Sequence, residues 1–120
     1  MHAIVLFGHG SRDPLWRQPI EAVAARVAAH APHVPVRCAY LELCAPDLAT
    51  AVHELVQAGA TSVQVLPMFL GVGRHAREDL PQLLDALRAR HPNLRLDVMP
   101  AVGEHPRMVA LMAELALQPL

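Results

Sequence analysis

The feature that most constrains the fold is a regular alternation between two kinds of segment. Short, continuous runs of apolar, β-prone residues are typical of buried strands, and longer segments with apolar residues every three or four positions are typical of amphipathic helices. Strands that alternate with helices in this way predict a parallel sheet covered by helices. We expect strands at residues 3–7, 36–41, 62–66 and 94–99, and helices at residues 14–29, 46–58, 76–90 and 106–117.

The predicted fold is therefore α/β, with three layers: a four-stranded parallel sheet and helices on both of its faces. A chain of 120 residues is about the size of one domain. No linker, internal repeat or low-complexity stretch divides it, so we expect a single domain over residues 1–120. Hydrophobic residues make up 53% of the chain but few are aromatic, so the core must be built from Val, Leu, Ala and Ile.

Charge, hydropathy and cysteine content argue against several classes of protein. The net charge of −1 provides no field that would attract nucleic acid or an anionic membrane. No apolar run approaches the roughly 18 residues of a membrane-spanning helix, and the apolar start at residues 1–7 is too short for a signal peptide. Cys38 and Cys44 lack metal-binding spacing and are expected to be free thiols. We therefore expect a cytoplasmic protein without nucleic-acid or membrane partners.

Three of the eight histidines follow predicted strands, where a parallel sheet binds its ligands. In such sheets the ligand crevice lies beyond the carboxyl ends of the strands. His9 follows the first predicted strand, Glu42 the second, His75 the third and His105 the fourth. The other five histidines lie at the chain start, on predicted helices or at the opposite edge. These four residues are therefore the first candidates for a functional site.

The pattern around His9 and His75 indicates a metal site. His9 lies between two glycines, which let the backbone turn sharply and approach a ligand, and His75 ends a glycine-containing loop before a predicted helix. Imidazole nitrogen is a suitable ligand for Co²⁺, Ni²⁺, Fe²⁺ or Zn²⁺. We interpret His9 and His75 as ligands of one divalent ion, with Glu42 as the best third candidate. Such a site leaves the ion partly hydrated, so that it can be handed on.

Each candidate also has a purely structural interpretation. His9 could bond to the backbone of its turn, and His75 could be a solvated residue at a helix start. Glu42 could be a strand-end charge that faces water. His105 precedes Pro106 and could serve only at the N-terminus of the last helix.

Arginines and apolar residues near the histidines indicate the kind of substrate. Lys is absent, so every fixed cation is an Arg, and Arg12, Arg74 and Arg77 lie close to the histidines in sequence. Arginine suits a substrate with several carboxylates, although simple solvation remains the alternative. The loop at residues 67–72 is apolar although it should border the crevice. It could line a wall for a flat hydrophobic ring, or complete the core, or do both.

Four motifs, taken together, resemble one known family over essentially the whole chain. They are Gly8-His9-Gly10-Ser11-Arg12, Leu41-Glu42, Leu66-Pro67-Met68-Phe69-Leu70 with Gly73-x-His75-x-x-x-Asp79-Leu80-Pro81, and Gly103-x-His105-Pro106. In this order and spacing they resemble the short, single-domain sirohydrochlorin chelatases, which are class II tetrapyrrole chelatases (lyases) of cobalamin and siroheme biosynthesis. The resemblance implies one half of a ferrochelatase-like bilobal fold. It also implies a homodimer that places two half-sites across one cavity.

The resemblance further implies roles for individual residues. His9 would be a metal ligand and the acceptor of pyrrole protons, His75 the second ligand, and Glu42 an acidic catalytic residue near the metal. Ala45 departs from the family, because some short members carry an acid at that position, and Arg74 beside the metal histidine could alter the carboxylate contacts. The implied substrate contacts are Ser11, Arg12, Ala45, Leu70, Gly71, Val72, Gly73, Arg74, His75 and His105.

The implied reaction removes two pyrrole N–H protons from sirohydrochlorin and inserts a divalent metal ion. Co²⁺ is the expected metal substrate, with Ni²⁺ and Fe²⁺ as alternatives, and no organic cofactor is expected. A non-catalytic metal carrier could use the same histidines. Histidine phosphatases also place a His-Gly pair after the first strand, but with an Arg directly before the His, where this chain has Gly8.

Overall fold

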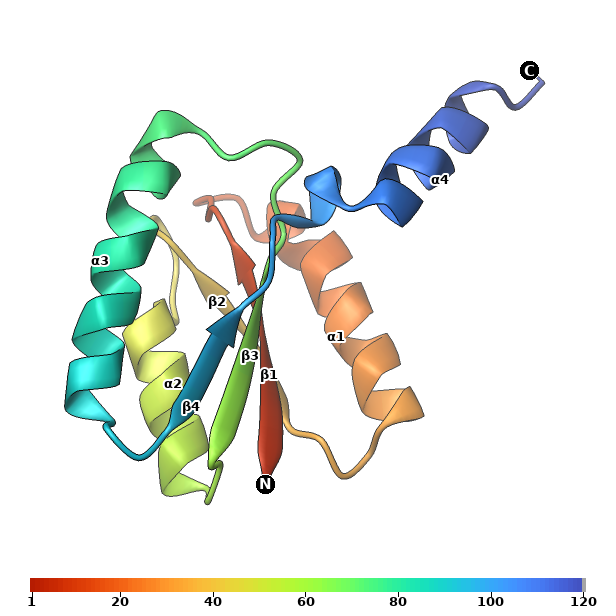
Figure 1. Ribbon diagram of the computed structural model, residues 1–120. Coiled ribbons are helices and arrows are strands. Elements are labelled where there is room, and N and C mark those ends of the chain that lie inside the picture. The colour runs from red at the N-terminus through yellow and green to blue at the C-terminus, as the bar shows by residue number, and fades with distance from the viewer. Residues whose placement is uncertain (120) are drawn as a thin grey trace.

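The computed structural model describes residues 1–119, and Leu120, the last residue of the predicted domain, lies outside them. Four strands form one sheet, and Figure 1 shows helices on both sides of it. In chain order the elements are β1 (His2–Gly8), the 3-10 helix η1 (Pro14–Arg17), α1 (Gln18–His30), β2 (Val36–Tyr40), α2 (Leu48–Gln57), β3 (Ser62–Pro67), α3 (Arg74–Arg90), β4 (Arg95–Val98), the 3-10 helix η2 (Val102–Glu104) and α4 (Pro106–Ala116).

The four strands form one parallel sheet in the order β2-β1-β3-β4. The central strand β1 is paired with β2 through residues 4–8 and with β3 through residues 2–7. In Figure 1, α1 lies on one face of the sheet, and α2 and α3 lie on the other. The predicted α/β fold, a four-stranded parallel sheet with helices on both faces, is confirmed.

The two faces of the sheet are buried to different extents. Alternate residues of β3, including Val63 and Val65, are fully buried in a large core that is shared with α2 and α3. The core on the α1 side is much smaller, and its buried residues are Leu6, Ile20 and Tyr40. Packing therefore anchors α2 and α3 firmly, whereas the opposite face of the sheet is covered only in part.

Two predicted helices begin later or are divided in the structure. The helix predicted over residues 14–29 is divided between η1 and α1. The helix predicted over residues 46–58 begins only at Leu48. The Asp47 side chain accepts a hydrogen bond from the Thr50 N–H at 2.8 Å, so the aspartate is the N-cap of α2.

The third helix begins earlier in the structure than expected. It was expected over residues 76–90, but α3 already begins at Arg74, so His75 lies in its first turn and not in the preceding loop. The expectation of a loop position for His75 was therefore wrong. The position matters because the first turn of a helix gives His75 a neighbour four residues further along the same helix.

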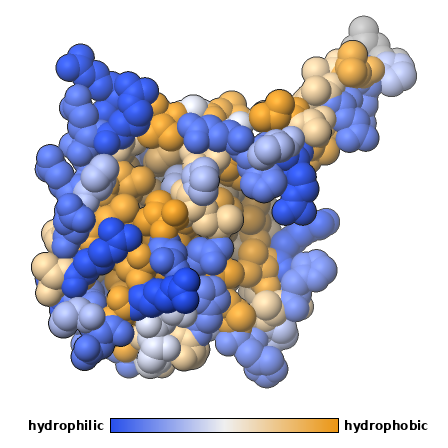
Figure 2. Space-filling view, in the orientation of Figure 1, coloured by the Kyte–Doolittle hydropathy of each residue, from blue (hydrophilic) through white to orange (hydrophobic). Residues whose placement is uncertain are grey.

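The last helix, α4, packs least of all the elements. It follows β4 through η2 and extends away from the sheet and the other helices (Figure 1). No residue of α4 is buried, and Figure 2 shows it standing clear of the body with hydrophobic side chains at its surface. Within residues 1–119, no helix has both the length and the apolar character needed to cross a membrane.

Candidate functional site

The carboxyl edge of the sheet brings the segments after β1 and β2 side by side. The backbone pairing of these strands continues past their ends. The N–H of Leu41 donates to the carbonyl of Gly8 at 2.9 Å, and the N–H of Glu42 donates to the carbonyl of His9 at 3.1 Å. Main-chain hydrogen bonds therefore hold Glu42 beside His9, as the rule for ligand sites in parallel sheets predicts.

The side chains of His9 and Glu42 also contact each other. Nε2 of His9 lies 3.1 Å from Oε1 of Glu42, and the two side chains are 50% and 41% exposed. A neutral imidazole that donates from Nε2 to a carboxylate keeps the lone pair of Nδ1 free. The pair can therefore bind a metal ion through Nδ1 or accept a proton there, while the carboxylate stabilises the cation that forms.

Gly10 makes this close approach possible. Its φ of 104° lies in the left-handed region that favours glycine. A Cβ atom at this position would overlap the carbonyl oxygen of Glu42. A larger residue would therefore push the Glu42 segment away from His9.

Phe69 supports the imidazole of His9 from the core side. The centroids of the two rings are 6.4 Å apart, and the ring planes are inclined at 69°. Phe69 is itself only 7% exposed and contacts Phe7 in an edge-to-face arrangement with centroids 5.9 Å apart. Phe69 therefore completes the core, which is one of the two interpretations of this apolar segment; the wall for a flat ring stays a prediction.

His75 belongs to a second histidine–carboxylate pair. Its Nε2 lies 2.6 Å from Oδ2 of Asp79, which is four residues further along α3. Residues with this spacing share one face of a helix, so the pair is built into α3. The carboxylate favours the tautomer with the proton on Nε2 and leaves Nδ1 free. Asp79 stands in one of the four sequence motifs without an assigned role, and its spacing from His75 identifies it as a partner once the helix is known to begin at Arg74.

The two pairs do not form a closed metal site. Among residues 1–119, no group of three or more His, Cys, Asp or Glu side chains is arranged to hold a metal ion. His9 and Glu42 lie together as expected, but His75 is paired with Asp79. An ion held by one or two imidazoles keeps open coordination positions. The arrangement suits an ion in transit better than a structural metal.

The three arginines near the site have different partners. Arg74 is 86% exposed and lies 3.0 Å from the carboxylate of Glu78. Arg77 donates to the carbonyl of Val72 at 3.1 Å and so ties α3 to the loop before it. Arg12 is exposed on the loop after β1. The Arg12 side chain is therefore exposed and can reach an anionic ligand, and Arg74 can do so from its exposed ion pair with Glu78, whereas Arg77 holds the loop.

The loop between β3 and α3 exposes apolar surface at the same edge. Leu70 is 69% exposed, and a Cβ atom at Gly71 or Gly73 would meet only open space. The start of the loop is anchored by η2, because the N–H of Gly103 donates to the carbonyl of Phe69 at 2.9 Å. The backbones are so close there that a Cβ at Gly103 would overlap Leu70. The loop thus presents an apolar edge from a fixed base.

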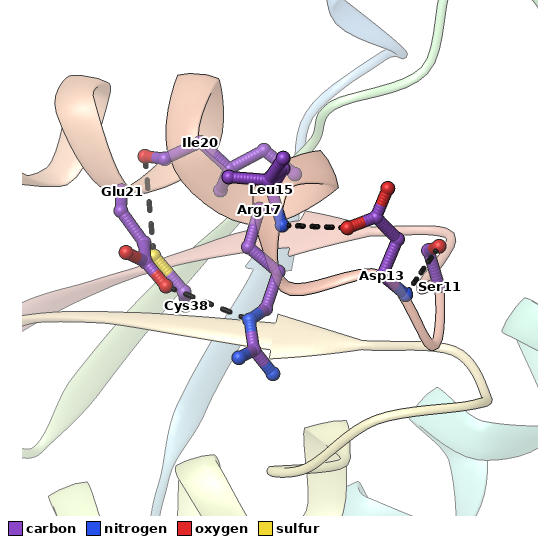
Figure 3. Close-up of polar contacts among 7 residues, drawn as sticks. All are labelled: Ser11, Asp13, Leu15, Arg17, Ile20, Glu21 and Cys38. Carbon is purple, nitrogen blue, oxygen red and sulfur yellow. Dashed lines mark hydrogen bonds and ion pairs between the residues drawn. The ribbon is translucent and has the colours of Figure 1, made fainter.

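The remaining predicted contacts have local structural partners. The Ser11 hydroxyl accepts a hydrogen bond from the Asp13 N–H at 3.1 Å (Figure 3). Ala45 lines an open groove beside α2. Nδ1 of His105 accepts from the Arg107 N–H at 3.0 Å and caps α4, which is the structural role that the sequence left open for this histidine.

The two cysteines are free thiols, as expected, and neither lies in the pairs described above. Burial under α1, and next the charge of Glu21, raise the pKa of Cys38, which lies beside Glu21 and Arg17 in Figure 3. Burial, followed by the charge of Cys38, raises the pKa of Tyr40 to about 12. Both groups are protonated at neutral pH, so neither is a candidate nucleophile or base.

Comparison with known proteins identifies the family of this chain. A family model described as CbiX matches residues 3–118. The sirohydrochlorin cobaltochelatase of Methanopyrus kandleri is 38% identical over 84 residues, which cover 70% of this chain and 59% of that relative. The chain thus spans less than two-thirds of the length of that relative.

Solved structures show the same fold. A CbiX protein from Marinobacter aquaeolei VT8 superposes with a TM-score of 0.80 at 29% identity, and the match covers 97% of this chain and 94% of that one. SirB, a sirohydrochlorin chelatase from Bacillus subtilis subspecies spizizenii solved in complex with cobalt, superposes with a TM-score of 0.78 at 30% identity. That match covers 94% of this chain but only 48% of SirB, so the chain is similar to about half of SirB.

Proposed function

The chain belongs to the CbiX family, and on this basis we propose that it is a chelatase that inserts a divalent metal ion into sirohydrochlorin. The observation that carries the proposal is the presence of two histidine–carboxylate pairs, His9 with Glu42 and His75 with Asp79. Co²⁺ is the proposed metal substrate, because the Methanopyrus kandleri relative is named a cobaltochelatase and SirB was solved with cobalt. Ni²⁺ and Fe²⁺ remain the alternative substrates.

In this mechanism His9 acts first as a ligand and then as a base. Its neutral Nδ1 binds the incoming ion and, once the ion has moved to the ring nitrogens, accepts a pyrrole proton. Glu42 stabilises the resulting imidazolium through Nε2. Insertion releases two protons, and His9 passes each of them to water because its side chain is half exposed.

His75 supplies the second imidazole, from the side of the loop. Asp79 orients it so that Nδ1 is available to the ion. Two imidazoles leave several coordination positions open, so the ion can exchange protein nitrogens for ring nitrogens one at a time. A tighter site with three or four protein ligands would retain the metal instead.

The proposed macrocycle site lies along the same edge. The exposed apolar part of the β3–α3 loop would contact a ring face, and the guanidinium groups of Arg12 and Arg74 would bind peripheral carboxylates. Arg77 supports the loop by its bond to Val72. The full set of proposed substrate contacts is Ser11, Arg12, Ala45, Leu70, Gly71, Val72, Gly73, Arg74, His75 and His105.

A second copy of the chain would complete the cavity. This chain is similar to 48% of SirB, so SirB has a further stretch of comparable length that this chain does not match. A homodimer would supply that second half and place two copies of each histidine around one macrocycle. The cytoplasm is the proposed location, because it is a compartment in which Cys38 and Cys44 remain free thiols.

The proposal is tested by following the absorbance of sirohydrochlorin with Co²⁺, Ni²⁺ and Fe²⁺ in parallel. We expect insertion to be abolished in His9→Ala and in His75→Ala, because each removes a ligand. His33→Ala is the matched control, since His33 is exposed between α1 and β2 and should be dispensable. Circular dichroism checks that all three variants fold.

Unchanged insertion rates in both site variants would contradict the assignment. A metal carrier is the second candidate, because the same open site could bind an ion without transferring it. Stoichiometric Co²⁺ binding with no change in the absorbance of sirohydrochlorin would favour the carrier.

A further inference from the structure

Two histidines outside the candidate functional site lie close together where α2 and α3 meet. His53 lies in α2, and His91 is the C-cap residue of α3. The centroids of their rings are 5.9 Å apart, and the ring planes are inclined at 39°. His91 comes shortly before β4, so the pair lies toward the amino ends of the strands, away from His9 and His75 (Figure 1). The two histidines are therefore available for a separate role.

The Nε2 atom of His91 lacks the partner that a buried polar atom normally has. It is buried, and no group within residues 1–119 forms a hydrogen bond with it. Buried polar atoms are usually paired with protein, water or an ion, because an unpaired one costs free energy. The neighbouring side chain of His53 is exposed, so it can turn between rotamers and let a ligand reach this nitrogen. A ligand that binds imidazole nitrogen would satisfy both histidines.

Both histidines are held by well-ordered parts of the backbone. The His91 N–H donates to the carbonyl of Leu87 at 2.9 Å, and the His91 carbonyl accepts from the Leu94 N–H at 3.0 Å. Val56 lies one turn after His53 on the same side of α2, and it lines an open pocket of about 290 Å³ together with His91. The two imidazoles can therefore converge on a ligand through side-chain rotation alone.

A divalent transition-metal ion fits the separation of the two rings. Metal–imidazole bonds are about 2.0–2.1 Å long, so the centroids of two imidazoles on one ion lie roughly 5–6 Å apart. No third His, Cys, Asp or Glu completes such a site in the part of the chain that the structure describes, so water would occupy the other coordination positions.

The charges around the pair are compatible with a bound cation. His91 lies at the carboxyl end of α3, where the partial negative charge of the helix favours a cation. Arg90 is the fixed cation next to it in the sequence, but its side chain is exposed, so water and salt screen its charge. The helix end therefore offers attraction close to His91 and only screened repulsion.

We propose that His53 and His91 together bind a divalent transition-metal ion such as Ni²⁺, Zn²⁺ or Cu²⁺, all of which accept imidazole ligands. Because α2 and α3 share the large core, an ion bound to both helices links two elements that pack there. An ion that binds the folded arrangement and not the unfolded chain stabilises the fold by mass action. The site does not depend on metal insertion, because it uses neither His9 nor His75.

Calorimetric titration with Ni²⁺ tests the site in the full-length chain. His9→Ala and His75→Ala are introduced first, so that the proposed insertion site does not contribute, and we expect the chain still to bind Ni²⁺. Adding His53→Ala or His91→Ala should weaken binding about tenfold or more, and the two together should weaken it hardly further, because residues that share one ligand are not independent. In the matched control His33→Ala, which removes an exposed histidine, binding should be unchanged.

The outcomes of this titration separate the proposed site from other ways of binding the ion. His2 lies at the same edge of the sheet, and its Nδ1 is 2.8 Å from the Ser62 hydroxyl. Loss of binding in His2→Ala and not in His53→Ala would overturn the proposal. Equal dissociation constants for His53→Ala and His33→Ala would also overturn it. Fully additive losses for His53→Ala and His91→Ala would contradict a single shared ion.

Thermal unfolding with and without Ni²⁺ tests the link between the helices. Saturating Ni²⁺ should raise the unfolding midpoint of the chain that lacks His9 and His75, and the rise should disappear when His53→Ala is added. His53 is exposed, so this variant should fold normally even if His91→Ala does not, and circular dichroism without metal checks this. An equal rise with and without His53 would show that the ion stabilises another part of the chain and would overturn the proposal.

Discussion

Nε2 of His75 lies 2.6 Å from Oδ2 of Asp79, within one turn of α3. The corresponding pair at His9 is formed differently, because its carboxylate comes from the segment after a neighbouring strand. Both arrangements place a carboxylate on Nε2 and leave Nδ1 free. The same kind of histidine–carboxylate pair is thus formed once within a helix and once between the segments that follow two neighbouring strands.

Asp79→Asn should weaken Co²⁺ binding about tenfold or more, because loss of a carboxylate partner lowers the basicity of a metal-binding imidazole and frees its orientation. Calorimetric titration with Co²⁺ measures the effect. Glu78→Gln is the control: Glu78 is the preceding residue and pairs with Arg74 instead. Equal dissociation constants for the two variants would show that Asp79 has no part in metal binding.

Glu42→Gln should lower the initial rate of Co²⁺ insertion about tenfold or more, because an amide cannot stabilise the imidazolium of His9 as a carboxylate does. The unfolding midpoint should hardly change, since exposed ion pairs contribute little stability. Glu54→Gln, on the exposed side of α2, is the control. A rate equal to that of the control would remove Glu42 from the mechanism.

Gly10→Ala should destabilise the fold by about 1–3 kcal/mol, because alanine is strained at a φ of 104° and its Cβ would overlap the Glu42 carbonyl. Gly71→Ala should stay within about 0.5 kcal/mol, since a Cβ there meets open space. Urea denaturation compares the two. A similar decrease in the free energy of unfolding for both variants would mean that the Glu42 segment can shift to make room for the added Cβ at Gly10.

Asp47→Ala should cost about 1 kcal/mol at pH 7 through loss of the α2 N-cap. Hydrogen bonds with Thr50 hold the pKa of the Asp47 carboxyl below its ordinary value of 3.8. A carboxyl with a lowered folded-state pKa stabilises the fold above its unfolded-state pKa, and this stability is lost as the pH falls through the folded-state pKa.

The stability advantage of the wild-type chain over Asp47→Asn should therefore be present at pH 7 and shrink below about pH 4. The asparagine keeps the capping oxygen without a charge, so it isolates the charge-dependent part. Urea unfolding at several pH values gives the comparison. An advantage that stayed constant down to pH 3 would contradict a lowered pKa for Asp47.

The sheet and the position of His9 could be predicted because both depend on local patterns. Continuous apolar runs define the strands, and the chain must leave a parallel strand at its carboxyl end, so His9 and Glu42 had to reach the same edge. The contact of Asp79 with His75 could not be predicted, because it depends on α3 beginning at Arg74. The residue before that helix, Gly73, makes no side-chain cap that the sequence could signal.

The position of α4 was also beyond prediction from the sequence. Its periodic apolar residues predict a helix with one buried side, and the helix is present within one residue of the expected bounds. Periodicity identifies which side seeks burial, but it does not identify the surface that buries it. The direction of α4 depends on the Gly103 anchor, which is a contact with the distant residues Phe69 and Leu70.

The β3–α3 loop is fixed at both ends and unconstrained between them. Phe69 is buried at one end and α3 begins at the other, whereas Leu70 extends into solvent and Gly71 has space for a side chain. Substitutions at these middle positions would leave His9 and His75 where they are. Under the proposed function, selectivity for the macrocycle could thus be changed at a few positions without disturbing the histidines that bind the ion, and the two properties could be adjusted independently.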